Sequence, residues 1–476
     1  MPGHEAGVAH TQSGQHPRWL FPPEDVNALS PALWAGAVRR DGAELQVAGV
    51  PVTQIAAEVG TPAYVLDEAD FRSRARAFRD AFAGSDPRPG PGPVQPVPAS
   101  VYYAGKAFLC TTVVGWVVEE GLGLDVCTGG ELTVALRAGF PVERITLHGN
   151  NKSDAELRRA VEAGVGRVAV DSFDEIERLD RLAAAAGVVV PVLIRATVGV
   201  EAHTHDYIAT AHEDQKFGFS LADGDTEKAA RRVHGTEGLR LLGLHSHIGS
   251  QIFDTSGFEV AARRVLALHA SLSAEFGPLP ELDLGGGFGI AYTSRDDPQP
   301  PGQLAAGIRS IVAHECRALG IDVPHLSIEP GRSIAGPSTF TLYEVGTVKQ
   351  VTLDAGERRM YVSVDGGMSD NVRPALYDAD YSCTLASRRS DAAPVLARVV
   401  GKHCETGDVV VKDEFLPADI RRGDLLAVPG TGAYCRSMAS TYNHVPRPPV
   451  VAVHDGTLRV LLRRETEDDL LALDVG

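Results

Sequence analysis

The chain has 476 residues, of which 44% are hydrophobic and 22% charged, as expected for a globular protein with a large core. Its formal net charge of −17 disfavours nucleic acid and anionic membrane surfaces as general partners. The first thirty residues lack a basic start followed by an apolar run, and no later stretch approaches the roughly 20 apolar residues that span a bilayer. We therefore expect a cytoplasmic protein that neither binds nor crosses a membrane.

The N-terminal part of the chain, up to about residue 100, shows no regular alternation of strand-like and helical segments. Residues 1–30 are rich in glycine, histidine and proline, and we expect a mobile arm there. Residues 31–68 contain strand-like runs that we assign to a β domain completed by the C-terminal part of the chain. The proline-rich run at residues 86–98 predicts a surface loop.

A repeating pattern of short apolar runs and longer segments with helical periodicity starts near residue 101. The eight strand candidates lie at residues 101–105, 122–126, 145–149, 167–171, 188–196, 239–247, 281–285 and 326–330. The segments between them carry apolar residues three and four positions apart, with glycine near their ends. This pattern predicts an α/β fold, a closed (β/α)₈ TIM-like barrel, over residues 69–337. Strand-like runs separated by turn signals predict a second, mostly β domain of sandwich or barrel type over residues 338–476.

Metal and disulfide chemistry receive little support from the sequence. Six cysteines are spread along the chain without paired spacing, which favours reduced thiols. The histidine patterns His203–His205 and His245–His247 are weak candidates for metal ligands, and neither CxxC nor HExxH occurs. We predict no metal site.

The strand ends of the expected barrel carry reactive side chains. Catalytic groups of such barrels lie at the carboxyl ends of the strands. Lys106 follows the first strand; taken alone, it is as simply explained by a side chain that reaches solvent. However, the sixth strand ends in HSHIGSQ, the seventh in the glycine run Gly285–Gly287, and the eighth in EPGR. Glycine N–H groups before a helix suit a phosphate. Together, a lysine, a phosphate cradle, a histidine and an acid indicate a pyridoxal phosphate site with Lys106 as its Schiff-base lysine.

Nine blocks occur in order along the chain: YYAGKAFLC, LDVCTGGEL, HGNNKSDAEL, HSHIGSQIFD, LDLGGGFGI, EPGRSIAGP, VDGGMSDNVRPALY, GKHCETGD and TGAYC. From about residue 40 onward, the chain with these blocks resembles the meso-diaminopimelate decarboxylases, pyridoxal phosphate enzymes with an alanine racemase-like barrel, and in particular their actinobacterial forms. The resemblance implies pyridoxal 5′-phosphate as cofactor and decarboxylation of meso-diaminopimelate to L-lysine and CO₂, the last step of lysine biosynthesis. It also implies a homodimer whose active sites are shared between subunits.

The resemblance assigns cofactor roles to individual residues. Lys106 is expected to carry the cofactor, His247 to pack on the ring face and Glu329 to pair with the ring nitrogen. A carboxylate at this nitrogen argues for decarboxylation, since an alanine racemase on a similar barrel has an arginine there. The remaining cofactor-binding residues implied by the resemblance are Asp125, Arg195, Ser250, Gly285, Gly286, Gly287, Gly331, Arg332 and Tyr434.

Substrate recognition is also implied by the resemblance, through Arg332, Arg373, Tyr377, Glu405 and Tyr434. An arginine suits the remote carboxylate of diaminopimelate, and Glu405 suits its remote ammonium. Cys404 is expected to protonate the reacting carbon, and Cys404 with Glu405 to reach the site of the partner subunit. Thr406 stands where the family more often has serine, and it keeps the hydroxyl.

Two alternatives remain open at this point. One is a decarboxylase of another basic amino acid, such as ornithine or arginine, which has no remote carboxylate to bind. The other is a catalytically silent cofactor-binding protein on the same fold. The presence of both Lys106 and Cys404 disfavours the silent protein.

Overall fold

The computed structural model describes residues 17–83, 97–199, 216–353, 356 and 358–476. Residues 1–16 of the expected arm and most of the proline-rich run therefore lie outside the described residues. The chain divides into two compact units. We call residues 72–290 and 298–334 the barrel unit, and residues 1–71, 291–297 and 335–476 the β unit.

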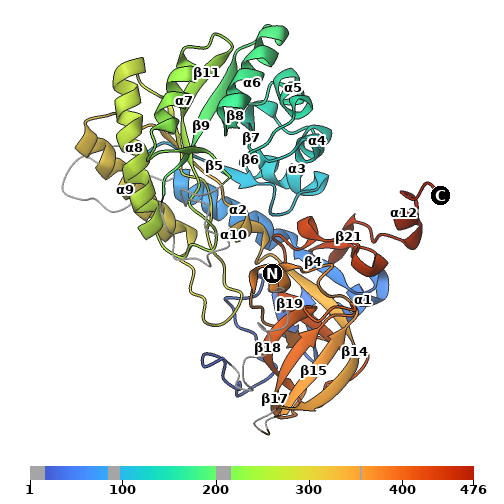
Figure 1. Ribbon diagram of the computed structural model, residues 1–476. Helices are drawn as coiled ribbons and strands as arrows, with labels where there is room; N and C mark the ends of the chain where they lie inside the picture. Colours follow the sequence, from blue (N-terminus) through green and yellow to red (C-terminus); the bar gives the residue numbers. More distant parts are fainter. Residues whose placement is uncertain (1–16, 84–96, 200–215, 354–355, 357) are drawn as a thin grey trace, which may run out of the picture. The chain divides into compact units, whose positions relative to one another are not determined.

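The barrel unit contains a closed ring of eight parallel strands, which confirms the predicted (β/α)₈ barrel (Figure 1). Pairing of β13 with β5 and of β8 with β9 closes the ring. Each predicted strand overlaps an observed one, while the two-residue strand β10 (Phe219–Ser220) beside β9 was not predicted. The ring strands are β5 (Ala99–Ala104), β6 (Gly123–Val126), β7 (Ile145–Leu147), β8 (Arg167–Val170), β9 (Val190–Thr197), β11 (Leu239–Ser246), β12 (Glu281–Asp283) and β13 (His325–Ile328).

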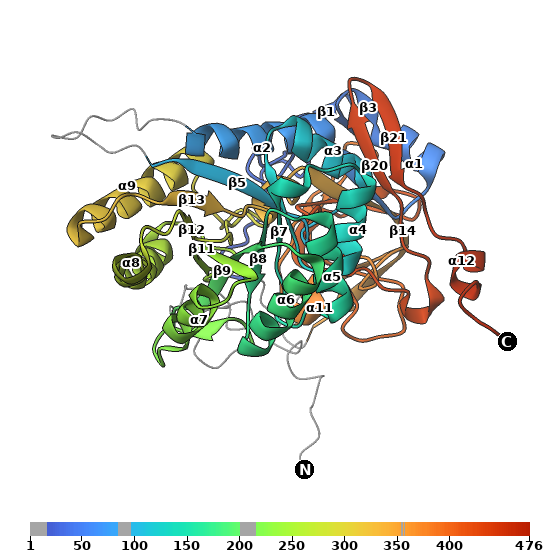
Figure 2. The same ribbon diagram turned by 90° about the horizontal axis from the view of Figure 1, so that it is seen from above.

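Helices follow the strands and surround the ring, as seen from above in Figure 2. They are α2 (Glu68–Ala83), α3 (Thr111–Glu119), α4 (Gly129–Arg137), α5 (Asp154–Ala163), α6 (Phe173–Ala186), α7 (Asp225–His234), α8 (Ser256–Phe276), α9 (Pro301–Leu319) and the short α10 (Arg332–Ala335). Helix α5 illustrates how the sequence sets their ends. Ser153 and Glu156 form a reciprocal capping box, and Gly164 ends the helix with φ +71°, in the left-handed region that favours glycine. Between these signals, Leu157 and Val161 are buried.

The β unit is mostly β-stranded, as predicted, and the long strand β14 organises it. This strand pairs antiparallel with β4, β15 and β19, and β20 pairs parallel with β4. The strands are β1 (Val38–Asp41), β2 (Glu44–Val47), β3 (Val50–Pro51), β4 (Ala63–Asp67), β14 (Thr339–Thr352), β15 (Arg358–Val364), β16 (Thr384–Leu385), β17 (Pro394–Val400), β18 (Val409–Pro417), β19 (Leu425–Pro429), β20 (Val450–His454) and β21 (Thr457–Leu462). The helices are α1 (Val52–Val59), α11 (Arg373–Tyr377) and α12 (Glu467–Leu471).

Segments far apart in sequence share the core of the β unit. Leu45 of β2, Val65 of β4 and Leu342 of β14 belong to one buried apolar cluster. Within the described part of the expected arm, the Asn27 amide exchanges two hydrogen bonds with the backbone of Ser390, at 2.8 and 2.9 Å. Among the helices that the structure describes, none combines the length and apolar character needed to cross a bilayer.

Candidate active site

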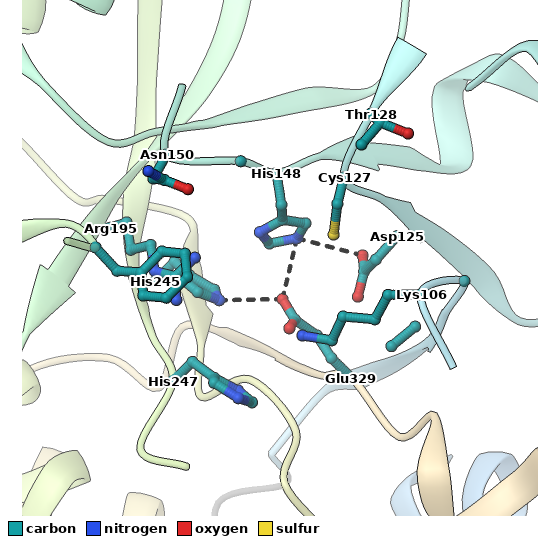
Figure 3. A pocket seen from close by; sticks show the side chains of 14 residues that line it. Lys106, Asp125, Cys127, Thr128, His148, Asn150, Arg195, His245, His247 and Glu329 are labelled. Carbon is teal, nitrogen blue, oxygen red and sulfur yellow. Dashed lines mark ion pairs between the residues drawn. The ribbon is translucent and has the colours of Figure 1, made fainter. Parts of the chain in front are cut away.

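The barrel unit holds a cavity of about 340 Å³ at the carboxyl ends of its strands, a size typical of small-molecule sites (Figure 3). Five residues predicted to bind the cofactor line it: Lys106, Asp125, Arg195, His247 and Glu329. The other lining residues are Ala104, Gly105, Cys127, Thr128, His148, Gly149, Asn150, Phe217 and His245. The barrel therefore brings together side chains from six different strand ends.

The turn after β5 directs Lys106 into this cavity. The Gly105 N–H donates to the carbonyl of Asp125 at 2.9 Å, and the Ala107 N–H donates to the carbonyl of Ala104 at 3.1 Å. A Cβ on Gly105 would lie 2.8 Å from the Asp125 carbonyl oxygen, so the turn requires glycine. Lys106 is thus held at the strand end by backbone contacts on both sides.

Glu329 lies at the centre of a cluster of ionisable side chains. Nε2 of His148 lies 3.2 Å from Oε1 of Glu329 and 3.5 Å from Oδ1 of Asp125. Nε2 of His245 lies 3.1 Å from the same Oε1, and the two imidazole rings are 5.0 Å apart. Figure 3 shows these three contacts as dashed lines.

The surroundings shift the pKa values of these side chains in different directions. Burial would raise the pKa of Glu329, but His148 and His245 outweigh it and hold that pKa well below its usual value. Burial would lower the pKa of His148, but the carboxylates of Glu329 and Asp125 raise it to about 9. Burial lowers the pKa of His245 to about 4. At neutral pH, His148 is therefore protonated and His245 neutral.

His148, His245 and Glu329 also form the one grouping in the described part of the chain whose ligand atoms lie close enough, within 4.8 Å, to hold a metal ion. Their direct contacts with one another already account for this closeness. We therefore assign no metal to the cluster. The other histidine pattern considered, His203–His205, lies outside the described residues.

The glycine run after β12 packs against His247 and Glu329. The Gly286 N–H donates to Nδ1 of His247 at 3.2 Å. A Cβ on Gly286 would lie 2.1 Å from the carbonyl oxygen of Glu329, which excludes any larger residue. Gly285 and Gly287 have φ values of +69° and +103°, in the region that favours glycine.

A charged pair inside the barrel supports this run from below. Oδ1 of Asp283 accepts a hydrogen bond from the Gly285 N–H at 2.8 Å, and its Oδ2 lies 3.0 Å from Nη2 of Arg167. The Arg167 guanidinium also lies over the Tyr102 ring, 4.2 Å from its centroid. Burial and the neighbouring Glu329 and Asp125 carboxylates raise the pKa of Asp283 well above its ordinary value, although Arg167 opposes the shift. Oδ1 can accept the Gly285 hydrogen bond whether or not the side chain carries a proton.

Two other predicted phosphate ligands contact each other. Nη2 of Arg332 donates to Oγ of Ser250 at 2.8 Å. A Cβ on Gly331 would lie 2.9 Å from Cβ of Ala104, so this glycine allows the turn after β13 to approach β5. An arginine, a hydroxyl and backbone N–H groups are donors that suit a phosphate.

Comparison with known proteins also indicates a pyridoxal phosphate enzyme. Residues 69–336 match the family described as pyridoxal-dependent decarboxylase, pyridoxal binding domain. A diaminopimelate decarboxylase of Mycobacterium tuberculosis is 59% identical over 453 residues, covering 94% of this chain and 98% of that protein. The chain belongs to the diaminopimelate decarboxylase family.

Further relatives of this family agree with the assignment. The diaminopimelate decarboxylase of Corynebacterium efficiens is 50% identical, covering 95% of this chain and 96% of the relative. The crystal structure of the M. jannaschii diaminopimelate decarboxylase in complex with L-lysine has a TM-score of 0.85 at 29% identity. It covers 93% of this chain and 99% of its own.

The cofactor of this family of decarboxylases is pyridoxal 5′-phosphate, and the cavity fits it. Gly285–Gly287 admit no Cβ, because each Cβ would lie within 2.7 Å of a backbone carbonyl oxygen, and such close backbone packing suits a glycine run that approaches a phosphate. Lys106 offers an amine at the cavity wall, and Glu329 offers a buried acid. His247 is held with Nδ1 as acceptor, so its ring is neutral and available for stacking.

The remaining predicted residues lie in the β unit. Arg373 begins α11 and is 4% exposed; its Nη1 donates to the Tyr381 hydroxyl at 2.7 Å, and its guanidinium lies 4.7 Å from the Tyr292 ring centroid. Among the residues that the structure describes, no carboxylate lies within ion-pair distance of Arg373. Tyr377 ends α11 half-buried, and Tyr434 is half-buried with φ +60°.

Cys404 and Glu405 are exposed on a well-fixed loop of the β unit. The Asp408 carboxylate accepts from the backbone N–H groups of Met368 and His403 at 2.6 and 2.7 Å. The Cys404 N–H donates to Oδ1 of Asn443 at 3.1 Å. The loop therefore presents both side chains to solvent from a rigid base.

Some cavity residues were missed by the sequence reasoning, notably His148, Cys127 and Asn150. His148 follows β7 directly, in ITLHGNN. The rule that strand ends carry function, applied to the third strand, would have identified it. His245 was considered only as a metal ligand. The pattern of apolar and polar residues along β11 does not reveal that His245 and His148 both contact the Glu329 carboxylate.

Proposed function

We propose that this protein decarboxylates meso-diaminopimelate to L-lysine and CO₂ with pyridoxal 5′-phosphate, as a carboxy-lyase of lysine biosynthesis. The observation that carries the proposal is the joint presence of Lys106, His247 and Glu329 in one cavity of a diaminopimelate decarboxylase family member. The structural neighbour bound to L-lysine, the expected product, supports the substrate class.

The cavity residues have distinct tasks in this reaction. Lys106 holds the cofactor covalently through its side-chain amine, and the neutral His247 ring packs against the cofactor ring. Glu329, as an anion, keeps a proton at the ring nitrogen. When bound, the cofactor supplies an electron sink for the pair left by the departing CO₂.

The phosphate of the cofactor is held by a set of neutral and cationic donors. Ser250, Arg332 and the backbone N–H groups of Gly287 and Gly331 supply them. Gly285 and Gly286, whose N–H groups bind Asp283 and His247, contribute by letting the backbone approach closely. Asp125, Arg195 and Tyr434 complete the proposed cofactor contacts. The position of Arg195 in the cavity lining supports its role, and its guanidinium lies 4.4 Å from the Phe217 ring centroid with Nη1 3.8 Å from Asp171.

Arg373 is the proposed determinant of substrate choice. A buried guanidinium with no carboxylate partner in the described part of the chain favours a bound anion, and its fork suits a carboxylate. We assign it to the remote carboxylate of diaminopimelate and Glu405 to the remote ammonium. Arg332, Tyr377 and Tyr434 complete the substrate contacts.

We further propose that the protein acts in the cytoplasm as a homodimer with shared sites. Cys404 protonates the reacting carbon, a role that suits a thiol as general acid. The rigid, exposed loop that carries Cys404 and Glu405 supports a role across a subunit boundary.

The proposal is tested by measuring CO₂ release from meso-diaminopimelate, ornithine and arginine by the cofactor-loaded protein. We expect release from diaminopimelate to exceed the other two, with L-lysine as the second product. Faster release from ornithine or arginine would identify a decarboxylase of another basic amino acid. No release from any of the three would identify a catalytically silent protein.

A further inference from the structure

Two buried carboxylates meet at a single imidazole nitrogen in the cavity. Asp125 lies on β6 and Glu329 follows β13, and Nε2 of His148 contacts them at 3.5 and 3.2 Å. Their exposures are only 3% and 6%. Two carboxylates this close in a buried site repel each other, and one takes up a proton unless a cation lies between them.

The other charged or titratable groups that face this pair or His148 are Lys106, Cys127, Glu131, Arg167, Arg195, His245, His247 and Asp283. Arg167 is 3.0 Å from Asp283, and Arg195 is 3.8 Å from Asp171. His247 accepts a hydrogen bond at Nδ1 and is therefore uncharged. Lys106 is committed to the cofactor in the proposed function. His245 contacts Glu329 alone of the two carboxylates, so it does not bridge them.

We propose that His148 is a positioning residue whose imidazolium allows Asp125 and Glu329 to be ionised together. This leaves Glu329 as an anion for the cofactor ring, so the inference rests on the proposed function of Glu329. The contacts at Nε2 carry it, because they join one nitrogen to both carboxylates. The raised pKa of His148, about 9, agrees with it.

The substitution His148→Gln tests this inference. Glutamine keeps an N–H donor at a similar reach but cannot carry charge. Without the cation, the proton that resided on His148 moves to the carboxylate pair. We therefore expect the C=O band of a protonated carboxylic acid to appear in infrared difference spectra at about pH 8 and to shift on exchange into D₂O.

His245→Gln is the matched control. It changes a histidine that contacts the same Oε1 of Glu329, but this histidine is neutral, so no new carboxylic acid band is expected. For His148→Gln we also expect kcat to fall on the order of tenfold. This is the effect of a rise of one unit in the pKa of Glu329, which makes the anion less available to the cofactor ring. A purely structural role of His148 would not create the infrared band.

The outcomes separate this inference from the proposed function. Absence of a new band in folded His148→Gln, or an equal band in His245→Gln, overturns the role of His148. If His148→Gln does not fold, the wild-type protein still decides, because a carboxylic acid band from the cavity at about pH 8, lost in Asp125→Asn, contradicts joint ionisation. Failure of the wild-type protein to release CO₂ would refute the proposed function instead.

Discussion

Gly286 donates its backbone N–H to Nδ1 of His247 at 3.2 Å, and this bond links the loop after β12 to the loop after β11. The bond makes Nδ1 an acceptor, so the proton of the neutral ring is on Nε2. The same glycine touches the backbone of Glu329 so closely that it admits no side chain. One backbone position thus orients the histidine proposed to stack on the cofactor and supports the acid proposed to pair with it.

Gly286→Ala is expected to weaken cofactor binding. The added Cβ would lie 2.1 Å from the carbonyl oxygen of Glu329, so the glycine run and the Glu329 turn must move apart. We expect the dissociation constant of pyridoxal 5′-phosphate, measured by absorbance titration, to rise at least ~10-fold, or ~1.4 kcal/mol. Gly115→Ala in α3 is the control, because a Cβ there meets nothing within 4 Å. Unchanged affinity in Gly286→Ala would contradict the proposed cradle.

Lys106→Ala is expected to lose the covalent cofactor altogether. After borohydride reduction of the loaded wild-type protein, mass spectrometry should place the pyridoxyl adduct on Lys106. The exposed Lys228→Ala variant should retain the adduct, since Lys228 lies on the surface of α7. An adduct on another side chain, or persistence of the adduct in Lys106→Ala, would refute this anchor.

Local sequence signals were enough to predict the barrel and the order of its strands along the chain. Strand runs such as RVAVD and helix ends such as Ser153 and Gly164 are encoded within a few residues, so periodicity and capping reveal them. The role of Lys106 was predicted from the set of residues at the strand ends, whereas the role of Glu329 at the ring nitrogen came from resemblance to a family. The barrel explains why such distant residues line one cavity, since parallel strands end on the same side.

The contacts between strand ends could not be predicted in the same way. His148 and His245 are 97 positions apart, and only the closed ring brings both Nε2 atoms to Oε1 of Glu329. Likewise, nothing near Arg373 in the sequence shows that Tyr292 and Tyr381 enclose its guanidinium. Such long-range contacts depend on strand register and loop path, which a single sequence does not display.

Arg373→Lys is expected to weaken substrate binding more than turnover. Lysine keeps the positive charge but loses the fork that binds both carboxylate oxygens, as well as the planar contact with Tyr292. We expect KM for meso-diaminopimelate to rise about 10-fold or more with a smaller change in kcat, as for loss of binding shared by substrate and transition state. The milder Tyr381→Phe change should raise KM less, because it removes only the 2.7 Å hydrogen bond to Arg373. A fall in kcat at constant KM would argue against substrate capture by Arg373.

Cys404→Ala is expected to retain the cofactor but to turn over slowly. Loss of a general acid costs on the order of 10²- to 10⁴-fold in rate. In a homodimer with shared sites, mixing the inactive Lys106→Ala protein with the slow Cys404→Ala protein in equal amounts under subunit exchange should restore roughly a quarter of the wild-type activity. This follows because half of the dimers are mixed and each has one intact site. Absence of any regain after verified exchange would contradict shared sites.

Acid sensitivity of the fold is expected to depend on His269, which lies on α8 and is 2% exposed. Burial lowers the pKa of His269 to about 4, whereas an unfolded histidine titrates near its ordinary value of about 6.5. The unfolded chain therefore binds the proton more strongly between these values. The free energy of unfolding should fall as the pH decreases through this window, by up to about 3 kcal/mol from this residue.

His269→Leu should remove this part of the pH dependence, because the apolar side chain has no proton to gain in the unfolded state. Urea unfolding at about pH 7.5 and about pH 5 measures the difference. The exposed His314 on α9 provides the control substitution, His314→Gln, which should leave the difference unchanged. Equal pH dependence in wild type and His269→Leu would show that the buried ring is not the source of acid sensitivity.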